Sequence, residues 1–196
     1  MKLVFPAPER NKQPILQVLQ RVLPATGTLL EIASGSGQHA AFFAGHFPQW
    51  NWLATDLAEA HLRSIAAYVA ESGLANLLPP RRLDVLDTDW GVDSVQAIFS
   101  ANLIHIAPWE CTLGLCAGAA QCLVAGGLLI LYGPFRIGGS DTSASNAAFD
   151  ADLKSRDPRW GVRDLEAVQA QAQRVGLQLI ERVAMPANNQ MLIFRR

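Results

Sequence analysis

The sequence predicts an α/β fold with a doubly wound, mostly parallel sheet of seven strands and a C-terminal antiparallel hairpin strand. The first observation is that short apolar runs, typical of buried strands, alternate with segments whose apolar residues recur at helical spacing. This alternation is typical of a parallel sheet covered by helices on both faces. The second observation is the short joint at 186–189 between the last two apolar runs, which suits an antiparallel hairpin.

In the first half of the chain, Ile15, Val18 and Leu19 repeat at helical spacing, and Pro24 follows as a stop signal. A buried strand then leads into a glycine-rich turn that opens a second helix. Gly73 closes a third helix. We therefore expect helices at 12–23, directly after 34–37 and at 58–72, with strands at 28–33, 51–56 and 81–85.

The second half continues the alternation. Gly126 and Gly127 end one helix, and Gly176 lies just past the end of another. We expect strands at 95–101, 128–133, 177–185 and 190–196, and helices at 109–124 and 164–175.

One segment departs from this regular connectivity. Residues 136–160 form a 25-residue connection that is long for a compact domain. Segments of this kind are often lids or binding loops, so we interpret it as a lid-like insert; the alternative is a surface insertion that carries an extra helix. With no internal repeat and no linker, the sequence predicts a single domain over residues 1–196.

Composition narrows the class of partner. Half of the 196 residues are hydrophobic, 17% are charged, and the formal net charge is -1. Lys and Arg do not cluster, whereas a nucleic-acid partner usually needs such a cluster to neutralise phosphates. We therefore expect a small-molecule partner and no nucleic acid. The sequence does not indicate an oligomeric state.

The N-terminal segment lacks the long apolar core of a secretion signal, and no run approaches the roughly 20 apolar residues of a membrane span. Cys111, Cys116 and Cys122 show no C-x-x-C spacing, so we interpret them as reduced core residues. No group of His and carboxylate residues has metal-ligand spacing, so no metal is expected. These observations favour a cytoplasmic protein without a membrane association.

A glycine-rich turn, Glu31–Gly37 (EIASGSG), follows the first expected strand. Ligands of open parallel sheets bind beyond the carboxyl ends of the strands, and glycines allow them to approach the backbone closely. Such a turn alone does not identify the ligand, because dinucleotide-binding proteins share it.

Carboxylates at the ends of three successive strands narrow the choice. Glu31 would repel a pyrophosphate but suits the positively charged amino group of a methionine moiety. Asp56, which follows Gly35 by 21 residues, can accept both hydroxyl hydrogens of a ribose. Asp84 is placed to meet an adenine edge, beside the backbone of Val85. This set fits S-adenosyl-L-methionine and fits a dinucleotide poorly. Asp84 would also suit a turn cap, and Asp56 a helix cap, a role compatible with ribose binding.

These residues resemble a known family. EIASGSG, the acidic residue ending the second strand, and LDV resemble the first motifs of class I S-adenosylmethionine-dependent methyltransferases. SANLIHIAPW is similar to the strand-four motif of small-molecule members, with Ile106 in place of a second His. Nearly all of residues 10–196 resembles an uncharacterised methyltransferase-like family, a former domain of unknown function (DUF938 or UPF0585 type). The segments that carry this resemblance are RNKQPIL, LLEIASGSGQHAAFFA, LYGPFR, TSASNAAFDADLKSRDPRWGVRDLEAV and MPANNQMLIFRR.

The resemblance implies the class I methyltransferase fold, Rossmann-like, and S-adenosyl-L-methionine as the cofactor, but no particular substrate. The sequence thus predicts a methyltransferase (EC 2.1.1.-) that acts on a small, polar or anionic molecule. The expected cofactor-binding residues are Glu31, Ala33, Gly35, Gly37, His39, Asp56, Leu57, Asp84, Val85 and Asn102.

Methyl transfer needs chiefly the alignment of a nucleophile behind an already electrophilic methyl carbon, so a catalytic triad is not required. His105 is the candidate general base, with Asn102 beside it; a structural role is the alternative for this histidine. His39, inside the helix after the glycine turn, is expected to pack or to contact cofactor. His46 and His61 are expected to be exposed.

The acceptor pocket is expected at the same edge of the sheet, built from the ends of the fourth and fifth strands, the insert and the final hairpin. For its aromatic residues, core packing is the alternative. Arg136, Arg159 and Arg163 flank the insert and favour an anionic group on the acceptor. The expected acceptor-binding residues are Asn11, Trp109, Tyr132, Phe135, Arg136, Asn146, Phe149, Asp150, Asn188 and Asn189, with Trp160 added by the insert.

Two other functions are weighed against this one. A nicotinamide oxidoreductase is disfavoured by Glu31 and by the missing Tyr-x-x-x-Lys pair, because Tyr68 leads to Ser72 and Tyr132 to Arg136. A non-catalytic S-adenosylmethionine-binding sensor or partner protein would carry the same cofactor motifs. Release of S-adenosylhomocysteine distinguishes the enzyme from the sensor.

Overall fold

The computed structural model describes residues 1–196, which group into two compact units. The first unit comprises Met1–Asp84 and Val95–Ser100, and the second comprises Val85–Ser94 and Ala101–Arg196. The expectation of a single domain stays a prediction.

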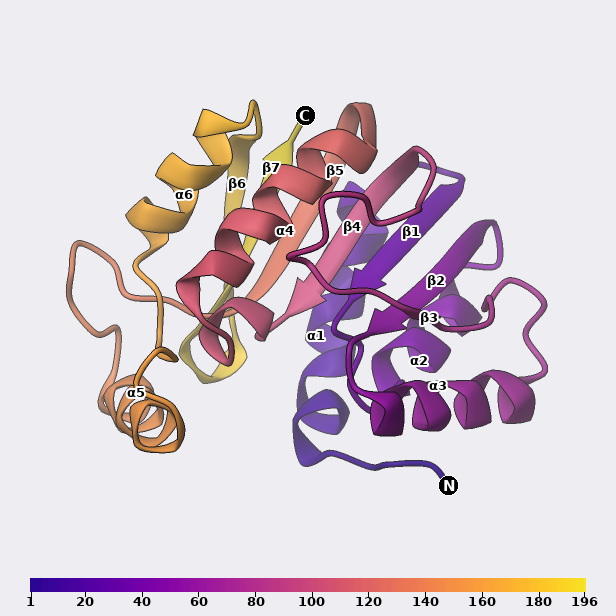
Figure 1. Ribbon diagram of the computed structural model, residues 1–196, viewed down its shortest axis with the longest axis horizontal. Coiled ribbons are helices and arrows are strands. Elements are labelled where there is room, and N and C mark those ends of the chain that lie inside the picture. The colour runs from indigo at the N-terminus through magenta and orange to yellow at the C-terminus, as the bar shows by residue number, and fades with distance from the viewer. The chain divides into compact units, whose positions relative to one another are not determined.

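The strands of the first unit are all parallel and follow the order β3-β2-β1-β4 (Figure 1). Their apolar side chains are buried, as expected for strands covered on both faces. The third strand is shorter than expected. Its pairing with β2 ends at Arg82, which lies opposite Asp56, and the next amide, that of Leu83, donates to the Asp56 carbonyl at 3.2 Å. The strands are β1 (Gly27–Ile32), β2 (Trp50–Asp56), β3 (Arg81–Arg82) and β4 (Val95–Ala101).

Three helices belong to the first unit, α1 (Pro6–Val22), α2 (Gln38–His46) and α3 (Glu59–Ser72). Helix α1 begins six residues before the expected start at 12, because Pro6 occupies the first helical turn, where its missing N–H leaves no bond unmade. Helix α1 packs against α2, and both α2 and α3 pack against β2.

The second unit contains a three-stranded group in the order β5-β7-β6 (Figure 1). Strand β7 is antiparallel to both of its neighbours, so the expected C-terminal hairpin is confirmed. The joint is a short 3-10 turn, η2 (Pro186–Asn188). The strands are β5 (Leu123–Pro134), β6 (Gln178–Met185) and β7 (Asn189–Arg195).

The helices of this unit are α4 (Trp109–Cys122), α5 (Ala144–Arg156) and α6 (Leu165–Arg174), with a 3-10 turn η1 (Leu103–His105) directly after β4. Helices α4 and α6 pack against each other and cover β5 and β6. Helix α5 fills most of the 136–160 insert, and the Ser143 hydroxyl caps it by accepting a bond from the Asn146 amide at 3.1 Å. None of the helices is long and apolar enough to cross a lipid bilayer.

Helix α4 depends on a glycine. A Cβ built on Gly118 would lie 2.0 Å from Cζ2 of the buried Trp90. We therefore predict that Gly118→Ala lowers the free energy of unfolding by about 1–3 kcal/mol, the usual range for overpacking. The matched control is Gly45→Ala in α2, where the nearest atom would stand 3.7 Å from the new Cβ and alanine should be neutral or stabilising. Urea unfolding measures both; equal stability of Gly118→Ala and the native protein would contradict the prediction.

Candidate functional site

The glycine loop between β1 and α2 has a left-handed backbone at three alternate positions, with φ values of 55° at Ala33, 59° at Gly35 and 91° at Gly37. The two glycines serve different purposes. A Cβ on Gly35 would meet only the ring of Phe5, at 3.5 Å, whereas a Cβ on Gly37 would lie 2.9 Å from the Ile65 Cα. Gly35 is therefore the position at which a ligand can approach the loop, and Gly37 is required for packing against α3.

Asp56, at the end of β2, holds this loop in place. One carboxylate oxygen accepts the amide N–H of Gly35 at 2.9 Å, and the other accepts the amide of Ala58 at 2.9 Å. His61, which was expected to be exposed, is half-buried and bonds through Nδ1 to the same carboxylate at 3.0 Å, so that expectation was wrong. Oδ1 bonds to both Ala58 and His61, whereas Oδ2, which bonds only to Gly35, has a further lone pair that can accept a ligand hydroxyl.

Glu31 lies at the end of β1 and is only 2% exposed. Its carboxylate accepts the indole N–H of Trp52 at 2.6 Å. Burial raises the pKa of Glu31 to about 7, because the charged form loses its hydration; the Trp52 hydrogen bond acts in the opposite direction. Glu31 is thus a buried carboxyl group poised to become charged when a cation binds beside it.

The other expected cofactor residues are divided between the units. Leu57 directly follows β2 with an exposed side chain, and Asp84 is half-buried at the end of the first unit. Val85 and Asn102 belong to the second unit. The backbone of Asn102 is left-handed, with φ of 64°, and its amide donates to the Tyr132 carbonyl at 2.8 Å.

His39 and Asn11, which the sequence assigned to cofactor and acceptor respectively, bond to each other. Nε2 of His39 lies 2.7 Å from Oδ1 of Asn11 and links α2 to α1. Burial lowers the pKa of His39 to about 4, and the ring stacks on Phe43 with centroids 5.2 Å apart. A neutral imidazole donating to Asn11 is therefore the stable form, and both side chains serve the packing of the first unit.

His105 is fully buried, and this burial lowers its pKa to about 3, with the charge of Arg163 acting in the same direction. Nδ1 accepts the backbone N–H of Arg163 at 3.3 Å, so the hydrogen of the neutral ring is on Nε2. Nε2 is buried and has no hydrogen-bond partner in the structure. A ring in this state can donate a hydrogen bond but cannot accept a proton at Nε2, which argues against His105 as a general base.

Several side chains expected to touch the acceptor are used within the second unit. Phe135 is fully buried against His105, with ring centroids 5.0 Å apart, and Tyr132 is also buried, so core packing holds for both. The side-chain amide of Asn146 donates to Thr142 Oγ1 at 2.7 Å and to the Asn188 carbonyl at 3.0 Å. Asn146 therefore ties the insert to the final hairpin rather than facing a ligand.

Asp150 anchors α5 in the same way. One carboxylate oxygen accepts the Val162 amide at 2.8 Å, and the other accepts bonds from Arg136 at 2.9 Å and Lys154 at 2.6 Å. These bonds hold the pKa of Asp150 below its ordinary value despite the opposing effect of burial. The carboxylate that the sequence assigned to the acceptor is therefore part of the framework, and α5 is docked by it.

At the final hairpin, Asn188 is exposed with φ of 58°, and the Asn189 side chain donates to the Pro186 carbonyl at 3.0 Å. The Asn189 amide therefore stabilises the turn itself. Phe149 is half-buried on α5.

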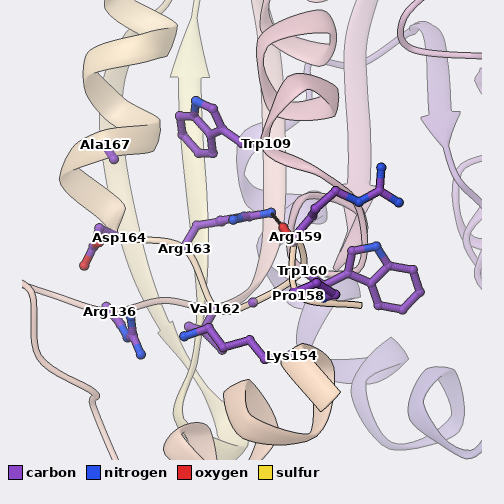
Figure 2. Close-up of a pocket in the computed structure, with 11 residues that line it drawn as sticks. Trp109, Arg136, Lys154, Pro158, Arg159, Trp160, Val162, Arg163, Asp164 and Ala167 are labelled. Atoms are coloured by element: carbon purple, nitrogen blue, oxygen red, sulfur yellow. Dashed lines mark hydrogen bonds between the residues drawn. The ribbon is translucent and has the colours of Figure 1, made fainter. Parts of the chain in front are cut away.

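A pocket of about 270 Å³ opens in the second unit, where loop 158–164 meets the starts of α4 and α6 (Figure 2). The sequence placed Trp109, Arg136, Trp160 and Arg163 at such a pocket, and all four line it. The sequence also indicated Arg159, but it did not predict the other lining residues, because nothing in a charge or hydropathy pattern tells which side of a loop faces a hollow. The other lining residues are Lys154, Pro158, Gly161, Val162, Asp164 and Ala167.

Arg163 differs from the other cations of the pocket. Arg136 and Lys154 pair with Asp150, and Arg159 pairs with Asp157. The guanidinium of Arg163 instead donates only to backbone carbonyls, those of Ile104 at 2.8 Å, Ala107 at 2.7 Å and Arg159 at 2.9 Å. In Figure 2 it points away from the Asp164 carboxylate. Its positive charge is therefore not neutralised by a carboxylate partner.

None of Cys111, Cys116 and Cys122 forms a disulfide, and the last two are buried. The structure contains no group of three or more His, Cys, Asp and Glu side chains arranged to hold a metal ion.

Solved structures show the class of fold. An O-methyltransferase family protein from Burkholderia thailandensis is 16% identical, with a TM-score of 0.81 over 94% of this chain and 56% of its own. A putative O-methyltransferase from Nostoc punctiforme PCC 73102 is 16% identical, with a TM-score of 0.82 over 94% of this chain and 55% of its own. PigF, solved with SAH, is 14% identical, with a TM-score of 0.78 over 93% of this chain and 55% of its own. This chain spans just over half the length of these proteins.

These likenesses confirm the expected fold, the seven-stranded α/β arrangement of class I methyltransferases with an antiparallel strand near the C-terminus. The family itself follows from the sequence. The chain belongs to the family described as "Protein of unknown function (DUF938)", whose model matches residues 2–196, so the expected family is also confirmed.

The raised pKa of Glu31 has a consequence for stability. Its pKa is 4.5 without burial and about 7 in the folded protein, so the folded state binds more protons between these values and loses stability as pH rises through them. Glu31→Gln keeps an acceptor for Trp52 and removes the buried charge. We predict that this substitution raises the free energy of unfolding by up to about 3 kcal/mol at pH 8, and much less at pH 5.

Urea unfolding at the two pH values measures this difference. Glu59→Gln, an exposed carboxylate in the first turn of α3, is the control and should show no comparable pH dependence. An equal effect of Glu31→Gln at pH 5 and pH 8 would rule out a buried, ionisable carboxyl at this position.

Proposed function

We propose that the protein is a methyltransferase that uses S-adenosyl-L-methionine and acts on a small, polar or anionic molecule. The observation that carries the proposal is the arrangement of Asp56, Gly35 and Glu31. A carboxylate at the end of β2 supports the amide of an open glycine, while a second carboxylate lies buried at the end of the neighbouring β1.

The residues of the first unit fit this cofactor by their chemistry. Asp56 would accept a ribose hydroxyl on the remaining lone pair of Oδ2, and a second one by replacing His61 on Oδ1, while Gly35 leaves the backbone open to the ligand. Glu31, whose pKa is about 7, would take its charged form beside the ammonium group of the methionine moiety. The same buried carboxylate would oppose a pyrophosphate. The SAH in the structure of PigF, which shares the fold, supports this choice of cofactor.

When bound, S-adenosyl-L-methionine supplies an electrophilic methyl group on a sulfonium, and the protein has chiefly to bind and orient the acceptor. The neutral, fully buried His105 would hold the backbone of Arg163 rather than act as a base. A protein that works in this way needs an acceptor that is already a good nucleophile or that loses its proton to solvent.

We propose that the pocket at Arg163 receives an anionic group of the acceptor. The guanidinium lacks a carboxylate partner, is half-buried, and lies with its Cζ 5.7 Å from the ring centroid of Trp109. An anion bound at Arg163 would be attracted more strongly than one at Arg159, because the charge of Arg159 is already neutralised by Asp157. Trp109 offers a flat apolar wall beside it.

For the cofactor, we predict that calorimetry detects binding of S-adenosyl-L-methionine and S-adenosylhomocysteine and no binding of NAD or NADP. Asp56→Ala should weaken S-adenosylhomocysteine binding by roughly 1–3 kcal/mol, because the ribose hydroxyls lose their acceptor. Asp56→Asn keeps one acceptor oxygen and should weaken S-adenosylhomocysteine binding less. Glu59→Ala removes an exposed carboxylate and is the control, with unchanged affinity expected. Binding of NAD in place of S-adenosylhomocysteine would reject the proposed function.

For the acceptor, we predict that a labelled-methyl assay finds turnover with small carboxylates or phosphates and less with their uncharged amides or esters. Arg163→Gln should raise the KM for the anionic acceptor by about tenfold or more while leaving the KM for the cofactor unchanged. Arg159→Gln, which removes an exposed cation from the same pocket, is the matched control. Affinity for the cofactor with no turnover on any acceptor would favour the non-catalytic sensor.

A further inference from the structure

The residues before α1 form a strap, residues 2–5, that lies on the first unit. The amide of Leu3 donates to Ser64 Oγ at 2.7 Å, and this hydroxyl donates to the Ser36 carbonyl of the glycine loop at 2.6 Å. Lys2 bonds to Glu71 at 2.6 Å and lies over the ring of Tyr68. The strap is therefore fixed to α3 and, through Ser64, to the loop.

A second anchor joins the strap to the loop directly. The amide of Phe5 donates to Gln38 Oε1 at 2.6 Å, and the same oxygen accepts the Ser36 hydroxyl at 2.8 Å. Gln38 is only 6% exposed, and its amide nitrogen donates to Glu9 at 2.7 Å. Because Gln38 and Ser36 belong to the loop and the first turn of α2, the position of Phe5 is set by the glycine loop itself.

The ring of Phe5 lies against the open glycine. Its Cε2 is 3.5 Å from the place where a Cβ of Gly35 would stand. On its other side the ring makes an edge contact with His61, with centroids 5.9 Å apart, and His61 is bonded to Asp56. An aromatic side chain thus lies at the junction of the two residues that would hold a ribose.

The identity of this residue is unusual for its place in the chain. Phe5 is the N-cap of α1, a position that favours Ser, Thr, Asp or Asn, and it makes no side-chain cap hydrogen bond. Phe5 is also 37% exposed as a residue, so its burial within the protein is incomplete. Neither helix capping nor core packing accounts for an aromatic side chain here.

We infer that Phe5 covers the nucleoside part of the cofactor and retains it in the site. This inference rests on the proposed function. The ring supplies an apolar face beside Gly35, against which a sugar and base can pack, and ligand entry and release require the strap to lift from Ser64 and Gln38. Phe5 is accordingly a determinant of residence time for ligands that carry adenosine.

The experiment compares Phe5→Ala and Phe5→Tyr with Val4→Ala as the control, because Val4 lies in the same strap and is 68% exposed. Calorimetry gives the Kd of S-adenosylhomocysteine and of 5′-methylthioadenosine, and stopped-flow displacement gives the dissociation rates. We expect Phe5→Ala to weaken both ligands roughly tenfold through faster dissociation, in the range of aromatic packing on a base. Phe5→Tyr and Val4→Ala should match the native protein.

Three outcomes would overturn the inference. Native Kd and dissociation rate in Phe5→Ala would mean that the ring only fills space beside the loop. Equal losses in Val4→Ala would assign the effect to the backbone of the strap. If the native protein does not bind S-adenosylhomocysteine, the proposed function is rejected and this inference with it. The first two outcomes, in which the native protein binds the ligand, reject only the role of Phe5. Thermal unfolding is run in parallel; if Phe5→Ala is unfolded, Phe5→Leu keeps the apolar volume and carries the same comparison.

Discussion

The carboxylate of Asp56 is the interaction on which the candidate cofactor site depends. It bonds to the amide of Gly35 with one oxygen and to the amide of Ala58 with the other, so the loop after β1 and the start of α3 share one anchor. The left-handed backbone at Ala33 is less favourable than an ordinary loop conformation, and a bond from outside the loop compensates for such strain. The anchor comes from the end of β2, whose register against β1 is fixed by the parallel ladder.

The second unit uses the same device with different residues. Asp150 on α5 accepts the amide of Val162, and Arg163 donates to the carbonyls of Ile104 and Ala107. A charged side chain in each case satisfies backbone groups of a distant loop, which would otherwise lack partners. The two side chains differ in one respect: Asp150 has cations beside it, whereas Arg163 keeps an unneutralised charge at the pocket.

The sequence predicted the strands and helices well, because hydrophobic periodicity and Gly or Pro punctuation report burial directly. It also predicted that Glu31 and Asp56 end neighbouring strands, since parallel strands place their carboxyl ends at one edge. Whether a polar side chain faces a ligand or the protein is a different matter. Asn146 and Asp150 are polar residues in a long connection, and their inward bonds depend on the position of hairpin and loop far along the chain.

The same limit explains His61 and Phe5. His61 was expected to be exposed and no role was expected for Phe5, because only the three-dimensional position of Asp56 and Gly35 gives these two side chains their partners. His105 was found by its place after β4, but its protonation state depends on burial and on the backbone of Arg163. Local patterns thus located the ends of the strands, and long-range contacts decided the role of each side chain there.

The order β5-β7-β6 has a consequence for synthesis of the protein. Strand β6 reaches the sheet only through β7, which follows it in the chain, so β5 and β6 both lack their shared antiparallel partner until residues 189–195 have left the ribosome. Two strands with unpaired edges are exposed to other chains during this interval. A nascent chain of this protein therefore depends on rapid closure of the β6–β7 hairpin, and translation that stalls before β7 is complete would leave the second unit open to aggregation.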